Sequence, residues 1–163
     1  MAGLPGTGKT TLAYALGRRL SWHVIDKDKY KETLLKQGWD DEIAGIATYE
    51  LAFETARNVL ERQEASVILD SAALHTFILE KALNLLERVP DARLKVILCI
   101  ADRVTRDDRL RRRPAQLTNI RVNPETIADY LRLFEHLPPD TLKLYTINSL
   151  QEYLEEARNF LLN

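Results

Sequence analysis

Cysteine, histidine and long apolar runs are scarce in this 163-residue chain, and each scarcity excludes a class of protein. The single cysteine, Cys99, cannot form an internal disulfide, and its place in the apolar run at residues 96–100 favours core packing over a reactive thiol. The three histidines lack the spacing of a zinc site. No apolar run approaches the length of a membrane span, so we expect a cytoplasmic protein with no membrane partner. The net charge of −1 gives no bulk attraction to nucleic acid.

The most informative sequence motif lies close to residue 1. Residues 3–10 read G-L-P-G-T-G-K-T, which matches the G-x-x-x-x-G-K-[ST] pattern of a phosphate-binding loop. Glycine permits backbone conformations that turn successive N–H groups toward a polyphosphate. Lys9 adds positive charge beside the β- and γ-phosphates, and the Thr10 hydroxyl suits Mg²⁺. A helix is expected at residues 9–20, with its positive dipole end toward the anion. We therefore predict a nucleoside triphosphate site formed by Gly3, Pro5, Gly6, Thr7, Gly8, Lys9, Thr10 and Thr11.

Little of the chain precedes this loop, although a phosphate-binding loop normally follows a buried strand in the middle of a parallel sheet. Without that first strand, backbone groups in the core would lose partners at a cost of about 1–3 kcal/mol each. Two explanations remain open. Either the polypeptide begins upstream, which we favour, or another strand or a partner chain fills the place through self-association. We expect the chain as given to have low stability.

Short apolar stretches alternate with longer helical stretches, a pattern typical of an α/β protein with a parallel sheet. Strands are expected at residues 22–26, 66–70, 94–101 and 142–147. One helical region is expected at about residues 29–63, and helical spacing of apolar residues returns after each later strand. We predict a single domain over residues 1–163, in which a parallel sheet is flanked by helices.

Acidic residues follow the first two expected strands, at the edge of the sheet where ligands bind in open α/β folds. Asp70 ends an apolar strand and is predicted to hold Mg²⁺ with Thr10 and Asp26; the alternative for Asp70 is a helix cap or turn residue. Asp26 and Asp28 are two residues apart, so in an extended segment their side chains would point the same way. Asp28 is the predicted general base for an acceptor hydroxyl. The alternative is that Asp28 caps a helix and Asp26 is solvated.

Four arginines follow the third expected strand at a spacing that places them along one helix face: Arg103, Arg106, Arg109 and Arg113. Such a face can clamp a transferring phosphoryl group and the nucleotide, with Arg109 and Arg113 as the main candidates. The alternatives are a solvated face paired with nearby acids, or a grip on a nucleic-acid backbone.

Four segments together resemble the small P-loop kinases, the group that includes shikimate and gluconate kinases, chloramphenicol phosphotransferase, zeta toxins and kinases of the AAA_33 type. The segments are residues 3–11, 24–28, 67–70 and 109–113. The resemblance implies the three-layer P-loop NTPase fold, with ATP preferred to GTP, and Mg²⁺. It also implies an acceptor-binding helical region at about 29–63, a short lid at about 103–123 and an adenine contact at Asn148.

The resemblance implies ATP-dependent transfer of the γ-phosphoryl group to a hydroxyl of a small molecule. Lys9, Asp28, Arg109 and Arg113 would then be the catalytic residues. A polynucleotide 5′-hydroxyl kinase and a non-catalytic nucleotide-binding protein remain as alternatives. A GTPase switch is disfavoured because the sequence has no guanine-reading Asn-Lys-x-Asp element. Lys29 and Lys31 stand where several relatives have an arginine, so the identity of the acceptor cannot be transferred.

Overall fold

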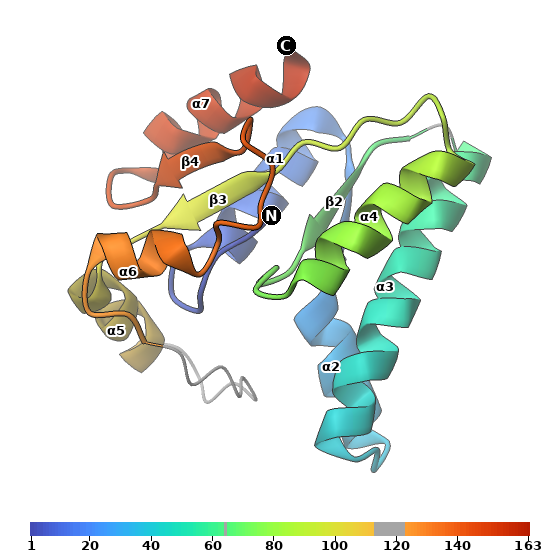
Figure 1. The fold of residues 1–163 in the computed structure, drawn as a ribbon, viewed down its shortest axis with the longest axis horizontal. Helices are drawn as coiled ribbons and strands as arrows, with labels where there is room; N and C mark the ends of the chain where they lie inside the picture. Colours follow the sequence, from blue (N-terminus) through green and yellow to red (C-terminus); the bar gives the residue numbers. More distant parts are fainter. Residues whose placement is uncertain (64, 113–122) are drawn as a thin grey trace.

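The computed structural model describes residues 1–63, 65–112 and 123–163. Seven helices and four strands lie within these residues (Figure 1): α1 (Lys9–Leu20), β1 (His23–Asp26), α2 (Lys27–Lys36), α3 (Asp41–Gln63), β2 (Val67–Asp70), α4 (Thr76–Arg88), β3 (Ile97–Ile100), α5 (Arg103–Arg111), α6 (Ile127–Arg132), β4 (Leu142–Tyr145) and α7 (Leu150–Leu162). None of the helices in the described ranges is long and apolar enough to cross a bilayer.

All strand pairing is parallel, as predicted. β1 pairs with β2, and the register places Asp26 directly opposite Asp70 at the carboxyl ends of the two strands. β3 pairs with β4, from Ile97 opposite Leu142 to Ile100 opposite Tyr145. The alternating order of helices and strands along the chain carries each strand back to the same edge of the sheet. The polar residues that follow the strands are therefore gathered at one edge.

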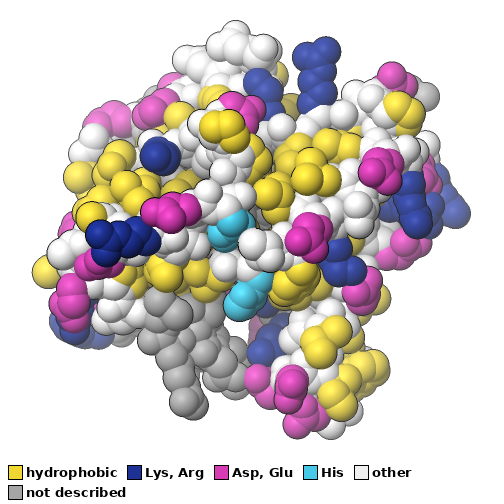
Figure 2. Space-filling view, viewed as in Figure 1, with side chains coloured by type: hydrophobic (Ala, Val, Ile, Leu, Met, Phe, Trp, Pro, Cys, Tyr) yellow, Lys and Arg dark blue, Asp and Glu magenta, His cyan; other side chains and the backbone are white. Residues whose placement is uncertain are grey.

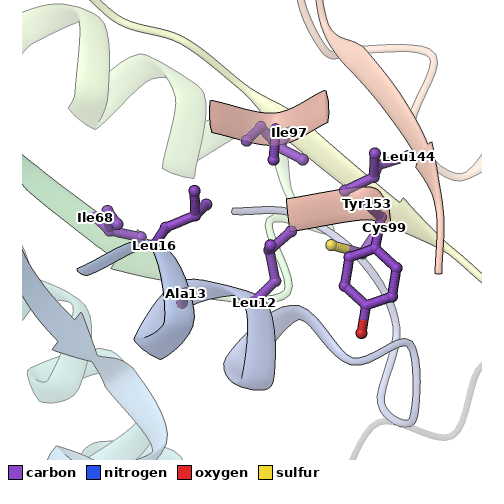
Figure 3. Close-up of a cluster of buried hydrophobic side chains, with 9 residues drawn as sticks. Leu12, Ala13, Leu16, Ile68, Ile97, Cys99, Leu144 and Tyr153 are labelled. Atoms are coloured by element: carbon purple, nitrogen blue, oxygen red, sulfur yellow. The ribbon is translucent and has the colours of Figure 1, made fainter. Parts of the chain in front are cut away.

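Helices cover both faces of the strands and form three layers. Leu12 and Leu16 of α1 pack with Tyr153 and Ala157 of α7 on one face, against inward residues of β3 and β4 (Figure 3). On the other face, α6 packs against Leu98 and Ile100, and α3 and α4 pack against β1 and β2. Adjacent residues of β3 thus enter opposite cores, which explains why all four of its residues are buried.

The first three residues connect the two pairs of strands. Ala2 forms a parallel bridge with Leu98; its N–H donates to Ile97 O at 2.8 Å, and its carbonyl accepts from Cys99 N–H at 2.9 Å. The α-ammonium of Met1 donates to the Leu69 carbonyl on β2 at 2.8 Å. Burial of this ammonium lowers its pKa. The segment before the loop therefore lies between β2 and β3, where a central strand is expected.

A cavity of about 470 Å³ lies between β2 and the residues leading into β3. Its walls come from β2, residues 94–97, α4, the end of α7 and Met1. Most of the side chains that line it are apolar, including Leu16, Ile78 and Leu85. The cavity has the position and the apolar lining of a site for one strand in the middle of a parallel sheet.

This cavity predicts a large gain in stability from an engineered extension. Four apolar β-branched residues placed before Met1 match the length of β2 and β3. Each is expected to contribute about 1.5–3 kcal/mol by burial, offset in part by about 1–2 kcal/mol per ordered residue. We expect the unfolding temperature to rise by about 10 °C or more, as measured by differential scanning calorimetry. An extension of four serine and glycine residues is the control and leaves it unchanged; equal effects of the two extensions would contradict the assignment.

The structure refines the local prediction at two places. The helical region at 29–63 is two helices, α2 and α3, because Gly38 has a φ of +87° and the chain turns there. The first of them begins at Lys27 rather than at Lys29, since the Asp26 carboxylate accepts hydrogen bonds from the N–H groups of Asp28 and Lys29. Asp26 and Asp28 therefore do not share one extended segment.

Candidate active site

The phosphate-binding loop connects Ala2 to α1, whose first residue is Lys9, as predicted. Gly6 and Gly8 have φ values of +82° and +83°, which side chains rarely adopt. A Cβ on Gly6 would lie 2.7 Å from the carbonyl oxygen of Arg106, so the loop packs directly on the backbone of α5. The Thr7 hydroxyl donates to Leu4 O at 2.8 Å inside the loop. Gly8 N-caps α1, so the open N-terminus of this helix faces the space enclosed by the loop.

Three polar residues lie together at the start of α1: its first two residues, Lys9 and Thr10, and Asp70 beside them. Lys9 is only 9% exposed, and its positive charge lowers the pKa of the Asp70 carboxyl. Burial acts in the opposite direction and is the larger effect, so the pKa of Asp70 is raised overall. A hydrogen bond with Thr10 also favours the ionised carboxylate. The structure thus brings Asp70, Lys9 and Thr10 together at the start of α1.

Asp70 also has an oxygen without a partner. Its Oδ1 is buried and accepts no hydrogen bond within the described structure. Asp26 lies opposite it on β1, and Thr10 adds a hydroxyl. No cluster of three or more His, Cys, Asp or Glu ligands occurs among the described residues. Two carboxylates and a hydroxyl suit Mg²⁺, which retains waters and takes other ligands from substrate phosphates.

The two acids after β1 have different environments. Asp26 is fixed twice: Oδ1 caps α2, and Oδ2 accepts from the Tyr14 hydroxyl at 3.2 Å. Asp28 is in the first turn of α2 with 67% of its side chain exposed, and its Oδ1 lies 3.3 Å from Lys27 Nζ. The structural alternative weighed from the sequence, in which Asp28 caps a helix and Asp26 is solvated, is wrong, because Asp26 caps α2 and also accepts a hydrogen bond from Tyr14. Asp28 is left available to a ligand.

The arginines of α5 do not form one uniform face. Arg109 reaches the loop, with Nη1 donating to Gly6 O at 3.3 Å and Nη2 to Thr146 O at 2.5 Å. Arg106 is 4% exposed and lies over the Tyr130 ring, donating to Asn123 Oδ1 at 3.0 Å. Arg103 pairs with Asp107 and Glu125. Arg113 lies outside the described residues. Of the arginines that the structure describes, Arg109 is the one whose guanidinium hydrogen-bonds to the phosphate-binding loop.

The phosphate-binding loop, α1, Asp70 and Arg109 all lie within the part of the chain that matches a known protein family. The model of the AAA_33 family, described as an AAA domain, matches residues 1–137. The chain belongs to the AAA_33 family. No curated protein matches it.

Several solved structures with the same fold as this AAA_33 chain are kinases by name. A "putative kinase" from Chloroflexus aurantiacus is 24% identical, with a TM-score of 0.72, and the match covers 98% of this chain and 95% of that one. A gluconokinase from Sinorhizobium meliloti is 17% identical, with a TM-score of 0.62 and coverage of 99% and 89%. The APS kinase of Mycobacterium tuberculosis, in complex with AMPPNP and APS, is 16% identical, with a TM-score of 0.67 and coverage of 99% and 95%. The predicted small P-loop kinase fold is confirmed.

The structure of this AAA_33 chain adds a residue that sequence reasoning missed. Thr146, just beyond β4, donates from its hydroxyl to Thr7 O at 2.5 Å and is contacted by Arg109. A hydroxyl at the carboxyl end of the last strand was the available signal, since ligands bind at that edge. Asn148, the predicted adenine contact, is exposed in the turn two residues later. The contact between β4 and the loop is therefore made by Thr146, and Asn148 faces solvent.

Proposed function

We propose that this chain is an ATP-dependent phosphotransferase that moves the γ-phosphoryl group to a hydroxyl of a small molecule. The main support is the buried Asp70 carboxylate with its unpartnered oxygen, held beside Lys9 and Thr10 at the mouth of the phosphate-binding loop. Nucleotide binding alone needs the glycines and the lysine. Phosphoryl transfer also needs side chains that hold the metal and activate the acceptor, and the carboxylates proposed for these two roles lie at the same edge of the strands.

Each residue has a role in this proposal. The N–H groups of Gly6, Gly8 and the first turn of α1, with the Lys9 ammonium, bind the phosphates, and Arg109 stabilises charge on the transferring group from its position beside Gly6. Thr10, Asp26 and Asp70 would hold Mg²⁺, which neutralises charge on the phosphate oxygens. Asp28 accepts the proton of the attacking hydroxyl. Arg113 and Asn148 stay in the proposal as predicted contacts to the phosphoryl group and the adenine.

The acceptor is proposed to bind beside Asp28, next to the helices α2 and α3. Lys27 lies 5.0 Å from the centre of the Tyr49 ring, and Tyr49 meets Phe77 edge to face at 5.3 Å. The similar gluconokinase, sugar kinase and APS kinase are named for small-molecule acceptors. These names support a small polar acceptor. The ring contacts of Tyr49 support a position beside aromatic side chains.

The polynucleotide kinase alternative receives little support from the arginines. Arg106 is buried, and Arg103 is engaged by Asp107 and Glu125, so neither is free to bind a nucleic-acid backbone. On the face shown in Figure 2, basic side chains are dispersed among acidic ones. An electrostatic footprint for nucleic acid would gather basic residues in a patch or stripe.

The test is a mass-spectrometric screen for phosphorylated products. Purified protein is incubated with Mg²⁺ and ATP and pooled metabolites carrying hydroxyl groups, and products that gain one phosphate are identified. GTP in place of ATP tests nucleotide choice, and single-stranded oligonucleotides with a free 5′-hydroxyl test the alternative acceptor. Binding of ATP with no product in any pool would instead support a non-catalytic nucleotide-binding protein.

A further inference from the structure

One hydrogen bond is altered in the parallel ladder that residues 2–4 form with β3. Ala2 N–H donates to Ile97 O, and Cys99 N–H donates to Ala2 O. In a parallel ladder the next bond would run from Leu4 N–H to Cys99 O. The hydroxyl of Tyr130 lies between these two groups instead. It accepts from Leu4 N–H at 2.9 Å and donates to Cys99 O at 2.7 Å.

The altered hydrogen bond marks the point where the chain leaves the sheet to begin the phosphate-binding loop. An inserted hydroxyl holds the Leu4 amide further from Cys99 than a direct hydrogen bond would. The fit around it is close: a Cβ on Gly3 would lie 2.7 Å from Cys99 O and 3.1 Å from the Tyr130 hydroxyl. The departure of the loop from β3 is therefore set by one side chain from α6.

Tyr130 is itself held in place. It is 1% exposed, its ring stacks on Phe134 at 5.3 Å between centroids, and Arg106 Cζ lies 5.8 Å from the ring centre. Burial raises the pKa of the phenol, so the hydroxyl keeps the proton that it donates to Cys99 O. The same Arg106 packs its backbone on Gly6, so Tyr130 and α5 hold the loop from two sides.

We infer that Tyr130 is a positioning residue for the phosphate-binding loop, whose hydroxyl spaces Leu4 from Cys99 and so sets the shape that receives the phosphates. The inference rests on the proposed nucleotide site. Its ligand is the triphosphate tail of a nucleotide, although Tyr130 itself does not touch it.

Tyr130→Phe removes the hydroxyl and keeps the ring. Leu4 N–H and Cys99 O then face each other without a bridge and are free to close, which draws the start of the loop toward β3. We expect the Kd for Mg²⁺–ATP, measured by isothermal titration calorimetry, to rise about tenfold, which corresponds to about 1.4 kcal/mol. The matched control is Tyr30→Phe, which also removes one phenol hydroxyl, in this case one that donates to Thr55 Oγ1 at 3.3 Å between α2 and α3. It is expected to leave the Kd for Mg²⁺–ATP unchanged.

The outcomes separate this inference from the proposed function. If the unmodified chain binds Mg²⁺–ATP and Tyr130→Phe binds it equally well, or if Tyr30→Phe weakens binding as much, Tyr130 does not position the loop. If the unmodified chain binds no nucleotide, the proposed function fails and this inference fails with it. If Tyr130→Phe does not fold, hydrogen exchange in the unmodified chain decides. Slow exchange at the Leu4 amide, slowed further by Mg²⁺–ATP, supports the bridge, and exchange as fast as in an unstructured peptide overturns it.

Discussion

Replacing Lys9 by alanine is expected to reduce phosphoryl transfer by at least about 10²–10³-fold, the effect of removing one preorganised donor from a developing charge. Lys9 is nearly buried at the start of α1, so its ammonium acts in a region from which water is largely excluded. The same substitution leaves Asp70 buried without its neighbouring cation, which raises the pKa of that carboxyl further and weakens its hold on Mg²⁺. Both effects lower nucleotide affinity and rate together. The measurements are the rate of product formation and the Kd for Mg²⁺–ATP.

Arg19→Ala is the matched control for Lys9. It removes one positive charge from the same helix, but Arg19 is exposed and lies 3.8 Å from Glu155 in a loose surface ion pair. Transfer by this variant should equal that of the unmodified chain, because an exposed ion pair contributes little. A Lys9→Ala chain that folds and transfers phosphate at the unmodified rate would remove the basis of the proposed function.

Replacing Asp28 by asparagine is expected to lower the transfer rate by about 10²–10⁴-fold, the usual contribution of a positioned general base. Mg²⁺–ATP affinity should be unchanged. The structure supports this separation because Asp26, not Asp28, caps α2, so an isosteric amide at position 28 leaves the helix terminus intact. The change removes the carboxylate and its contact with Lys27, an interaction that solvent weakens because the Asp28 side chain is 67% exposed. Rate and affinity are measured separately, at saturating nucleotide and by titration.

Glu32→Gln serves as the comparison for Asp28→Asn. Glu32 lies one turn further along α2, and its carboxylate is paired with Lys36 on the exposed side. Loss of this charge should alter neither rate nor affinity. Equal losses of ATP binding and transfer in Asp28→Asn would show instead that Asp28 has a structural role.

The loop and the helix after it were predictable because their determinants are local. Residues 3–10 require glycine at fixed spacings, and the helix at Lys9–Leu20 was predicted with the bounds observed. The four strands were also found, although each is shorter than expected. The position of Asp70 at the end of β2 was also predictable, because it closes an apolar stretch of strand-forming residues.

Other parts of the site depend on chain crossings that no local pattern records. Tyr130 lies 126 positions from its hydrogen-bond partner Leu4, and Thr146 lies 139 positions from Thr7. In the sequence, Tyr130 belongs to an ordinary helical stretch, and its hydroxyl gives no sign of its partners. Arg106 and Arg109 lie three residues apart in the same helical stretch. Arg106 is nevertheless buried against Tyr130, whereas the guanidinium of Arg109 hydrogen-bonds to the loop. Which arginine faces the loop depends on how α5 packs.

From its sequence alone this protein was determined to be a parallel α/β domain with a phosphate-binding loop at residues 3–10, because glycine spacing and apolar periodicity act over a few residues. Only the tertiary structure decided that Asp26 caps α2, that Arg109 is the arginine beside the loop, and that Met1 to Gly3 lie between β2 and β3. The physical reason is that hydrogen-bond partners for buried groups are chosen by which distant segments pack together, and that choice is made by the whole chain.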